Sequence, residues 1–437
     1  MLFRQFLEPG LGCASYLIGD QAAGEAAVVD PAYAIERYVD EASRHGFRIG
    51  LVLETHNHAD HVSGHGRLAL EHSARVAIHP LAEAAYAFEA LSDGQMLRVG
   101  DVTIRVVHTP GHRPEHCAFV VDERLVLTGD SLFVGDAARP DLAVGAAEGA
   151  EGLFHSLRRL EQLPDDVEVY PGHVAGSLCG ASLRPDPSST IGAERTGNRA
   201  LQISVVDDFV ADALSKNQPR PPNMDRIVEL NRGPFLGAPA QLVRLDRAEG
   251  PVLDVRDAEA FAAGHLPGAL SVPVTDDSFA TRAAFVLGDE PVVLQAVSTE
   301  QAEQAARGLR SVGVLDLAGY VVDPPGETAR IEPIDLDELD ALLRAGAVDV
   351  LDVREQDERD VAYIAGSRHI PYRLLPALGD GLGDRPVVTI CTTGARAGIA
   401  ASVLAARGME VRPVLEGGVP DWSARGGRTI EFRRCGS

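Results

Sequence analysis

Short apolar runs predict a series of buried strands in the first half of the chain. Ile49–Leu53, Val102–Val107, Leu125–Leu127 and Val167–Tyr170 have the length and composition of such strands. The last three are each followed by a turn that contains glycine, which lets the backbone bend sharply. We therefore expect the polar side chains in these turns to point into one shared site.

Other patterns predict the elements around these strands. Residues 14–18 and 26–29 are expected to be neighbouring strands of a meander, and a helical pattern runs from Ile35 to His45. A further helix is expected to begin near Ser63. Segment 216–239 is rich in Pro, Gly and Asn, which predicts a linker with one short helix, Met224 to Asn231, inside it.

The second half of the chain contains an internal repeat. The stretch Leu253–Arg256 returns as Leu351–Arg354, and Pro291–Leu294 returns with one change as Pro386–Thr389. Strand and helix patterns alternate in both copies. This alternation predicts two similar α/β domains with parallel sheets.

Composition and charge narrow the class of protein. A chain of 437 residues suggests about three domains, and a net charge of −24 argues against nucleic acid and anionic membranes as partners. No apolar run approaches the roughly 18 residues of a membrane span. The N-terminus has no apolar signal core, and the five cysteines are odd in number and widely spaced. We therefore expect a reducing, cytoplasmic location.

Histidine and aspartate residues gather in the turns that follow the predicted strands. Three histidines and one aspartate lie within residues 56–61, directly after the first strand, and each later turn adds one more. Neutral imidazole and carboxylate together suit zinc, iron or manganese. The seven candidate metal ligands are His56, His58, Asp60, His61, His112, Asp130 and His173.

This set of motifs resembles the metallo-β-lactamase superfamily, whose fold is an αββα sandwich with metals at one edge. Two branches of that superfamily fit. In a branch similar to glyoxalase II, all seven residues hold two metals, often zinc, that activate a water. In the persulfide dioxygenase branch, the resemblance implies one Fe(II) on His56, His112 and Asp130. The other four residues, His58, Asp60, His61 and His173, would then orient the site from outside the coordination sphere.

The stretch after Asp130 resembles the sulfur-metabolising branch more than the hydrolases. Gly135–Leu142 and Gly176–Gly180 carry this resemblance. Cys179, in the second of these stretches, is expected to be a buried small residue, and a role close to the substrate stays open.

The repeated units resemble the rhodanese domain. In the second copy, Cys391 follows a predicted strand, and the loop to Ala397 contains Gly394 and Arg396. Loop N–H groups and the helix that begins near Ala397 can converge on the sulfur, lower the pKa of a thiol in that place and hold an anionic sulfur species. We therefore expect Cys391 to be catalytic, with Gly394 allowing the tight turn and Arg396 adding positive charge.

The first copy departs from this pattern. Ala296 aligns with Cys391, and the loop that follows contains Ser298, Thr299 and Glu300 but no Cys, Gly or Arg. We expect this copy to be inactive as a sulfurtransferase. A smaller departure in the second copy, Gly366–Pro371, leaves its catalytic loop intact.

The order of these parts resembles fused persulfide dioxygenase–sulfurtransferases over the whole chain. The fold class expected is therefore a metallo-β-lactamase αββα sandwich followed by two rhodanese-like α/β domains. The expected limits are 1–215 for the dioxygenase domain, 216–239 for the linker, 240–328 for the inactive copy and 332–437 for the active copy.

The resemblance implies a coupled reaction of sulfur compounds. Iron, one per chain, would oxidise a glutathione or coenzyme A persulfide with O₂ to sulfite and thiol. Cys391 would then pass a sulfane sulfur to sulfite, giving thiosulfate, and a homo-oligomer is expected. The alternatives are a thioester hydrolase with a zinc pair and an appended sulfurtransferase, and a non-catalytic sulfur carrier or sensor.

Overall fold

The computed structural model describes residues 1–8, 10–174, 184–215, 219–322, 328–379, 382 and 385–431. Contacts divide the chain into two compact units. Unit 1 comprises Met1–Pro239 with Arg310–Gly313, and unit 2 comprises Ala240–Leu309 with Val314–Ser437. The four domain limits expected above stay a prediction.

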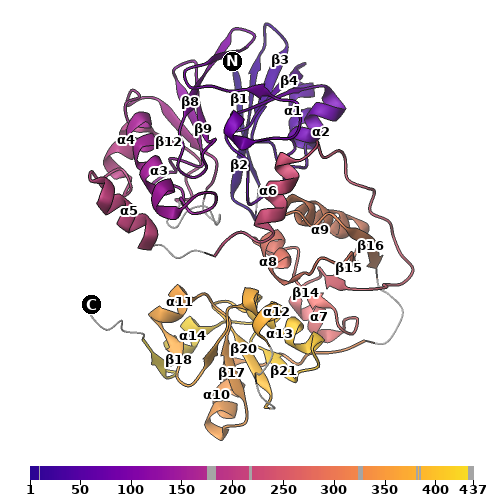
Figure 1. The fold of residues 1–437 in the computed structure, drawn as a ribbon. Helices are drawn as coiled ribbons and strands as arrows, with labels where there is room; N and C mark the ends of the chain where they lie inside the picture. Colours follow the sequence, from indigo (N-terminus) through magenta and orange to yellow (C-terminus); the bar gives the residue numbers. More distant parts are fainter. Residues whose placement is uncertain are drawn as a thin grey trace. The chain divides into compact units, whose positions relative to one another are not determined.

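Unit 1 contains two six-stranded sheets (Figure 1). The first sheet follows chain order, with β1 to β3 antiparallel and β3 to β6 parallel. Its strands are β1 (Leu2–Glu8), β2 (Cys13–Asp20), β3 (Glu25–Val29), β4 (Arg48–Leu53), β5 (Arg75–Ile78) and β6 (Glu89–Ala90).

The second sheet has the order β12-β11-β10-β9-β8-β7, in which only β10 and β11 are parallel. Its strands are β7 (Met96–Val99), β8 (Val102–His108), β9 (Cys117–Val121), β10 (Leu125–Gly129), β11 (Glu168–Pro171) and β12 (Ser189–Thr190).

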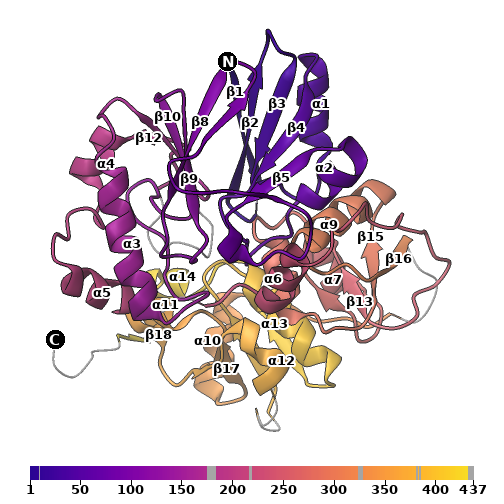
Figure 2. The same ribbon diagram turned by 45° about the horizontal axis from the view of Figure 1, so that its top comes forward.

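Apolar residues on the facing sides of the two sheets form the central core of unit 1. Ile18 and Leu53 of the first sheet and Phe119 and Leu127 of the second are completely buried in it. Alternate residues of each strand point the other way, since side chains on a strand alternate between faces. These outward residues pack against helices, so the order of layers is helix, sheet, sheet, helix, as Figure 2 shows.

Helices cover both outer faces of this sandwich. One face packs on α1 (Glu36–Arg44) and α2 (His65–His72), through Tyr38 and Leu68. The other packs on α3 (Ala146–Leu160), α4 (Ile191–Gly197) and α5 (Val206–Ser215). The metallo-β-lactamase sandwich is thus confirmed, as are the predicted strands that precede the metal motifs. Unit 1 also contains η1 (Pro80–Ala82) and α6 (Met224–Arg232), the helix expected within segment 216–239.

Unit 2 contains the two repeated α/β folds, each with a four-stranded, fully parallel sheet. The first copy consists of β13 (Val252–Asp254), α7 (Ala258–Ala263), β14 (Leu270–Ser271), α8 (Phe279–Val286), β15 (Val292–Ala296), α9 (Thr299–Ser311, whose end belongs to unit 1) and β16 (Leu317–Val322).

The second copy repeats this arrangement with added short elements. It consists of α10 (Leu336–Ala345), β17 (Asp349–Asp352), α11 (Gln356–Val361), β18 (Tyr363–Ile364), β19 (Arg368–His369), η2 (Tyr372–Leu374), α12 (Leu375–Leu378), β20 (Val387–Ile390), α13 (Ala395–Ala406), β21 (Val411–Pro413), α14 (Val419–Ala424) and β22 (Thr429–Ile430).

The motif shared by the two copies is a structural ion pair. Arg256 binds both oxygens of Asp254 and the carbonyl of Gly264, and Arg354 likewise binds Asp352 and a backbone carbonyl of its own copy. Asp254 and Asp352 are completely buried, so a fork of guanidinium N–H groups satisfies each carboxylate. This explains why the repeat is most visible at these positions.

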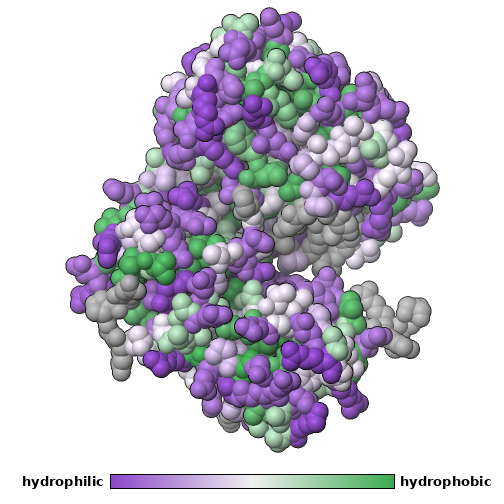
Figure 3. Space-filling view, turned by 180° about the vertical axis from the view of Figure 1, so that it is seen from behind, coloured by the Kyte–Doolittle hydropathy of each residue, from purple (hydrophilic) through white to green (hydrophobic). Residues whose placement is uncertain are grey.

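The visible surface is mainly polar. Hydrophilic residues cover much of the face that Figure 3 draws, with smaller apolar patches between them. Among the described residues, no helix combines the length and apolar character needed to cross a bilayer.

Candidate functional site

The seven candidate ligands of unit 1 lie together, in the turns that follow β4, β8, β10 and β11. Six of the seven residues are 3% exposed or less, and the Asp60 side chain is 13% exposed. They divide into a group around Asp130, a group around Asp60, and His58 by itself.

His56, His112 and Asp130 converge on one point. Asp130 Oδ2 lies 4.0 Å from His56 Nε2 and 3.5 Å from His112 Nε2. That carboxylate oxygen is buried and has no hydrogen-bond partner. An unpartnered buried carboxylate oxygen is costly, and a cation between it and the two imidazoles would satisfy it. The donor set therefore fits a metal.

Neighbouring groups leave the Nε2 atoms of both histidines available. His56 Nδ1 lies 2.9 Å from Thr55 Oγ1, whose hydroxyl donates to Asp30 at 2.8 Å. Thr55 Oγ1 therefore accepts from His56 Nδ1–H. His112 Nδ1 donates in the same way to the carbonyl of Arg139, at 2.9 Å. Each ring thus presents a lone pair at Nε2, as a metal ligand requires.

The ionisation states also suit a metal. Burial and the neighbouring histidines lower the pKa of His56 well below its usual value, and burial lowers the pKa of His112. Burial raises the pKa of Asp130, but the charge and hydrogen bond of His173 outweigh it and bring the pKa to about 2. Two neutral imidazoles and one carboxylate are therefore the stable forms at neutral pH.

His116, which sequence reasoning missed, fixes the backbone of this group. Its Nε2 accepts from the N–H of Asp130 at 2.9 Å, and its Nδ1 lies 2.8 Å from Thr109 Oγ1. Gly129, which precedes Asp130, has φ +49°, and a Cβ there would lie 2.6 Å from His116 Nε2. The glycine is required because only a residue without a side chain fits between the two loops.

His58 points to a separate acidic group. Its Nε2 lies 3.1 Å from Glu54 and 3.2 Å from Asp30, and its buried Nδ1 has no partner. Burial lowers the pKa of His58, but the two carboxylates raise it to about 9. Glu54 also accepts from Ser63 at 2.6 Å and contacts His65 at 3.0 Å. Sequence reasoning missed Asp30, Glu54 and His65, because no motif links them to the histidines.

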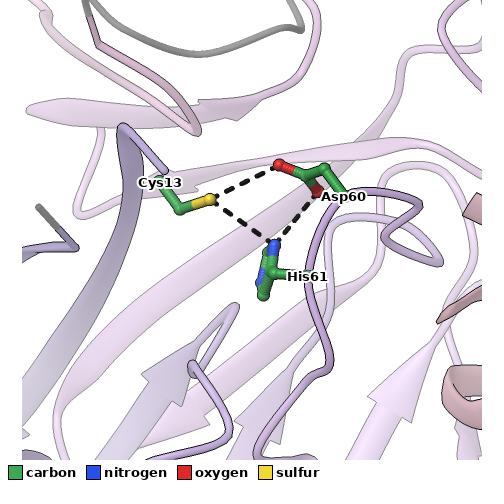
Figure 4. A group of neighbouring side chains, drawn as sticks. All are labelled: Cys13, Asp60 and His61. Carbon is green, nitrogen blue, oxygen red and sulfur yellow. Dashed lines mark hydrogen bonds and ion pairs between the residues drawn. The ribbon is translucent and has the colours of Figure 1, made fainter. Parts of the chain in front are cut away.

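Asp60, His61 and His173 lie on the other side of Asp130. His173 Nδ1 lies 2.7 Å from Asp130 Oδ1, and its Nε2 lies 2.8 Å from Asp60 Oδ2. Cys13 joins this group from the start of β2, as Figure 4 shows. The sequence analysis did not select Cys13, because it lies far from the histidine motifs in the chain.

Segment Gly135–Leu142 supports the site through its backbone. The carbonyl of Arg139 holds His112, and the Arg139 side chain forms two hydrogen bonds with Asp141, at 2.7 and 2.8 Å. The second stretch selected from the sequence, Gly176–Gly180 with Cys179, lies outside the described residues.

The Cys391 loop of unit 2 joins β20 to α13. Cys391 is 1% exposed, and the N–H of Gly394 donates to its Sγ at 3.1 Å. Gly394 has φ +101°, and a Cβ there would lie 1.8 Å from the carbonyl oxygen of Leu415. The helix begins at Ala395, two residues earlier than expected, so its N-terminus lies closer to the sulfur.

The Arg396 side chain forms an ion pair with a carboxylate in this loop region. Its guanidinium binds both oxygens of Glu358 on α11, at 2.5 and 2.6 Å, and also contacts Thr392 at 3.0 Å. Burial raises the pKa of Glu358, but Arg396 outweighs it and brings the pKa to about 2. The positive charge expected in this loop is thus largely balanced by a carboxylate.

Strand register places Ala296 where the second copy has Cys391. Gln295 pairs with Asp254, as Ile390 pairs with Asp352, so the next residue in each copy occupies the same position. Val297, which follows Ala296, is 56% exposed. The first copy therefore presents no thiol at this position.

Two family models match the chain. The metallo-beta-lactamase superfamily matches residues 9–173, and the rhodanese-like domain matches residues 238–322 and 335–425. The mitochondrial persulfide dioxygenase of Homo sapiens is 31% identical over 234 residues, which are 53% of this chain and 87% of that protein. The chain belongs to the metallo-β-lactamase superfamily. Fused to this domain are two rhodanese-like domains, so the expected architecture is confirmed.

Relatives that are named as hydrolases are also similar to this chain. A hydroxyacylglutathione hydrolase of Cereibacter sphaeroides is 33% identical over 260 residues, which are 57% of this chain and 91% of that protein. A solved metallo-beta-lactamase from Staphylococcus aureus subsp. aureus COL superposes with a TM-score of 0.69 and 30% identity, over 74% of this chain and 99% of that one. That match extends beyond the metallo-β-lactamase domain alone.

Proposed function

We propose that this protein is a persulfide dioxygenase coupled to a sulfurtransferase. One iron, held by His56, His112 and Asp130, would serve the oxidation of a glutathione or coenzyme A persulfide. Persulfide, O₂ and water would give sulfite, thiol and protons. Two histidines and one carboxylate on one face leave positions open for a sulfur ligand and dioxygen. The observation that carries this proposal is the unpartnered Asp130 Oδ2 beside two Nε2 atoms.

Residues around these three would keep them in place. Thr55 and the Arg139 carbonyl hold the two imidazoles in the required tautomer, and His116 holds the backbone of Asp130. His58, Asp60, His61 and His173 would act from outside the coordination sphere of the iron, with His173 binding the second oxygen of Asp130. Such partners keep ligand geometry and basicity constant.

Cys391 would carry the second reaction. Its thiolate would attack the sulfane sulfur of a second persulfide, take that sulfur and release the thiol. Sulfite would then attack the sulfane sulfur on Cys391, giving thiosulfate and restoring the thiolate. The Gly394 N–H and the N-terminus of α13 support this proposal, because both stabilise negative charge on sulfur. Cytoplasmic location and a homo-oligomeric state stay predictions.

A thioester hydrolase with two metals is the alternative in the first domain. It is favoured by the similarity to hydroxyacylglutathione hydrolases and by the presence of all seven ligand residues at one site. A further alternative, a non-catalytic carrier in which Cys391 hands sulfur to a partner, would show no turnover at either site.

The deciding experiment measures oxygen uptake and metal content on the same samples. Iron-loaded protein is expected to consume O₂ with glutathione or coenzyme A persulfide and to hold one iron per chain. His56→Ala should abolish the uptake, while His72→Ala, at an exposed histidine of α2, should not. Two zinc ions per chain with hydrolysis of thioesters, and no O₂ uptake with iron, would contradict the proposal.

A further inference from the structure

Helix α6, which lies in the segment predicted as a linker, contacts the loop that carries four of the seven candidate ligands. This loop, residues 54–64, joins β4 to α2, and we call it the ligand loop. We propose that Asn231 of α6 is a positioning residue for the metal site, because its side-chain amide fixes the backbone of the ligand loop. Segment 223–237 then belongs to the metal-binding domain and is more than a connection between domains.

Asn231 directs both polar atoms of its side chain at the ligand loop. Its Oδ1 accepts from the N–H of Ser63 at 2.8 Å, and its Nδ2 donates to the carbonyls of His58 at 3.1 Å and His61 at 2.8 Å. Asn231 is 4% exposed. A side-chain amide offers both an acceptor and two donors. Neither a carboxylate nor an apolar side chain of this size can form the same three bonds.

The ligand loop needs such partners because it is neither a helix nor a strand. Backbone groups in a regular element pair with one another, whereas the buried groups of a loop must find partners elsewhere. His58 and His61 are both buried. Loss of the Asn231 amide would remove one hydrogen bond from the N–H of Ser63 and one from each of two carbonyls. The loop would then have to shift to satisfy these groups, since a buried polar group without a partner is costly.

Two contacts connect the ligand loop to the proposed iron ligands. Asp60 Oδ2 lies 2.8 Å from His173 Nε2, and His173 Nδ1 lies 2.7 Å from Asp130 Oδ1. The ring centroid of His58 lies 4.3 Å from that of His56. A shift of the loop backbone would therefore disturb the neighbours of both Asp130 and His56. The orientation of a metal ligand depends on such neighbours.

Helix α6 is itself held at several points within unit 1. Ile227, in the middle of the helix, is completely buried, and the Asn223 amide donates to the carbonyl of Val312 at 3.0 Å. The carbonyl of Arg232 accepts from the N–H of Ala85 at 2.7 Å. Val312 belongs to unit 1, so all of these contacts lie within one compact unit. A positioning residue on a fixed helix holds its partners more precisely than one on a loop.

The test measures Co²⁺ binding to the metal-free, full-length protein by competition with a chelator, and records the visible absorption spectrum of bound Co²⁺. That spectrum reports the geometry of the ligands whether or not the protein consumes O₂. The inference rests on the proposed function only in naming His56, His112 and Asp130 as the metal ligands.

Two substitutions remove the amide in different ways. Asn231→Asp keeps the size and the acceptor but places a second acceptor against the two carbonyls. Asn231→Ala removes all three bonds and leaves room for a water, so it is the milder change for folding. Both variants should bind Co²⁺ about tenfold more weakly than wild type, the lower end of the range for an outer partner of a ligand. Their spectra should be shifted from that of wild type.

Two residues of the same helix provide matched controls. Ile227→Val shortens a completely buried side chain, and Glu229→Gln changes an exposed one. Ile227→Val should unfold at a lower denaturant concentration than wild type, yet both controls should keep the wild-type Co²⁺ affinity and spectrum. Wild-type affinity and spectrum in the Asn231 variants, or an equal loss in Ile227→Val, would overturn the proposal. Co²⁺ binding by a wild-type protein that consumes no O₂ when loaded with iron would count against the proposed function alone.

Discussion

At the scale of single residues, a hydrogen bond to Nδ1 of each imidazole decides which ring nitrogen can bind a metal. Asp30 accepts the hydroxyl proton of Thr55, and Thr55 accepts the Nδ1 proton of His56. This relay leaves Nε2 as the only lone pair of the ring. Residues that are not ligands thus determine whether the histidines are in the tautomer that can bind a metal.

Thr55→Val should weaken iron binding without removing a ligand. Valine has the shape of threonine but no hydroxyl, so His56 Nδ1 and Asp30 Oδ2 both lose their hydrogen bonds to this side chain. We expect iron affinity to fall about 10–100-fold, measured by competition with a chelator. Thr55→Ser restores the hydroxyl and should restore affinity. Equal iron affinity in the valine and serine variants would contradict a role for the hydroxyl.

Gly394→Ala tests the tight turn that follows Cys391. The substitution adds a Cβ at φ +101° against the carbonyl of Leu415, so the loop must shift and the N–H at this position must leave the sulfur. We expect loss of sulfur transfer from thiosulfate to cyanide. Gly408→Ala is the control, because Gly408 also has a positive φ, +79°, but a Cβ added there would meet no atom within 4 Å. The control should cost only about 1–2 kcal/mol of backbone strain and keep sulfur transfer. An equal loss of sulfur transfer in both variants would mean that backbone strain alone is responsible.

At the scale of elements, an ion pair joins α11 to the helix that follows Cys391. Glu358 binds Arg396 with both carboxylate oxygens and also accepts from Thr392 in the catalytic loop. Glu358 therefore holds the loop from both of its ends, through Thr392 at its start and through Arg396 on the helix that follows it. An ordered loop keeps its N–H groups directed at the sulfur.

Glu358→Gln should destabilise this domain in a pH-dependent way. The folded pKa of Glu358, about 2, lies below the ordinary 4.5, so its stabilisation is complete above about 4.5 and is lost as pH falls towards 2. At pH 7 we expect a loss of about 1–3 kcal/mol, as for a hydrogen bond to a charged group. In denaturant unfolding, the gap between wild type and variant should shrink from pH 5 to pH 3. A gap that stays constant would exclude the ion pair as its cause.

The loop between β15 and α9 should be dispensable for chemistry. Ser298, Thr299 and Glu300 occupy the place of the catalytic loop without offering a thiol. Alanine at each position should leave oxygen uptake and thiosulfate formation within about twofold of wild type, because none of the three side chains is a thiol nucleophile for sulfur transfer. A folded variant that no longer forms thiosulfate would reveal a role for the first copy.

At the scale of the whole molecule, the two chemistries belong to different units. The seven candidate metal ligands all lie in unit 1, and Cys391 lies in unit 2. One unit can therefore be inactivated while the other keeps its fold. Sulfite is the proposed product of the first reaction and the proposed acceptor in the second, so the product mixture would report on both.

Cys391→Ser and His56→Ala should separate these chemistries. A hydroxyl is a far weaker nucleophile than a thiolate at neutral pH, so Cys391→Ser should keep oxygen uptake while the product shifts from thiosulfate to sulfite. His56→Ala should stop oxygen uptake and keep sulfur transfer to an added acceptor. The ratio of sulfite to thiosulfate, measured with oxygen uptake, checks both. An unchanged ratio in Cys391→Ser would mean that thiosulfate forms elsewhere.

The sequence by itself was enough for features that depend on neighbours in the chain. Strand periodicity predicted the β4, β8, β10 and β11 segments, and the His and Asp motifs after them selected the seven candidate ligands that the structure places near one another. The repeat of Asp254–Arg256 as Asp352–Arg354 revealed two parallel α/β folds. These signals are local, because each arises within a few residues of one strand, turn or helix.

Only the tertiary structure decided which of these residues face one another. His56, His112 and Asp130 meet at one point, while His58 turns to Glu54 and Asp30, and Glu358 balances Arg396. Cys13 reaches His173 although 160 positions separate them in the chain. Such contacts form where separate strands and loops pack together, and no pattern along a single segment encodes them, since burial and partner choice arise only when elements from distant parts of the chain close on a common core.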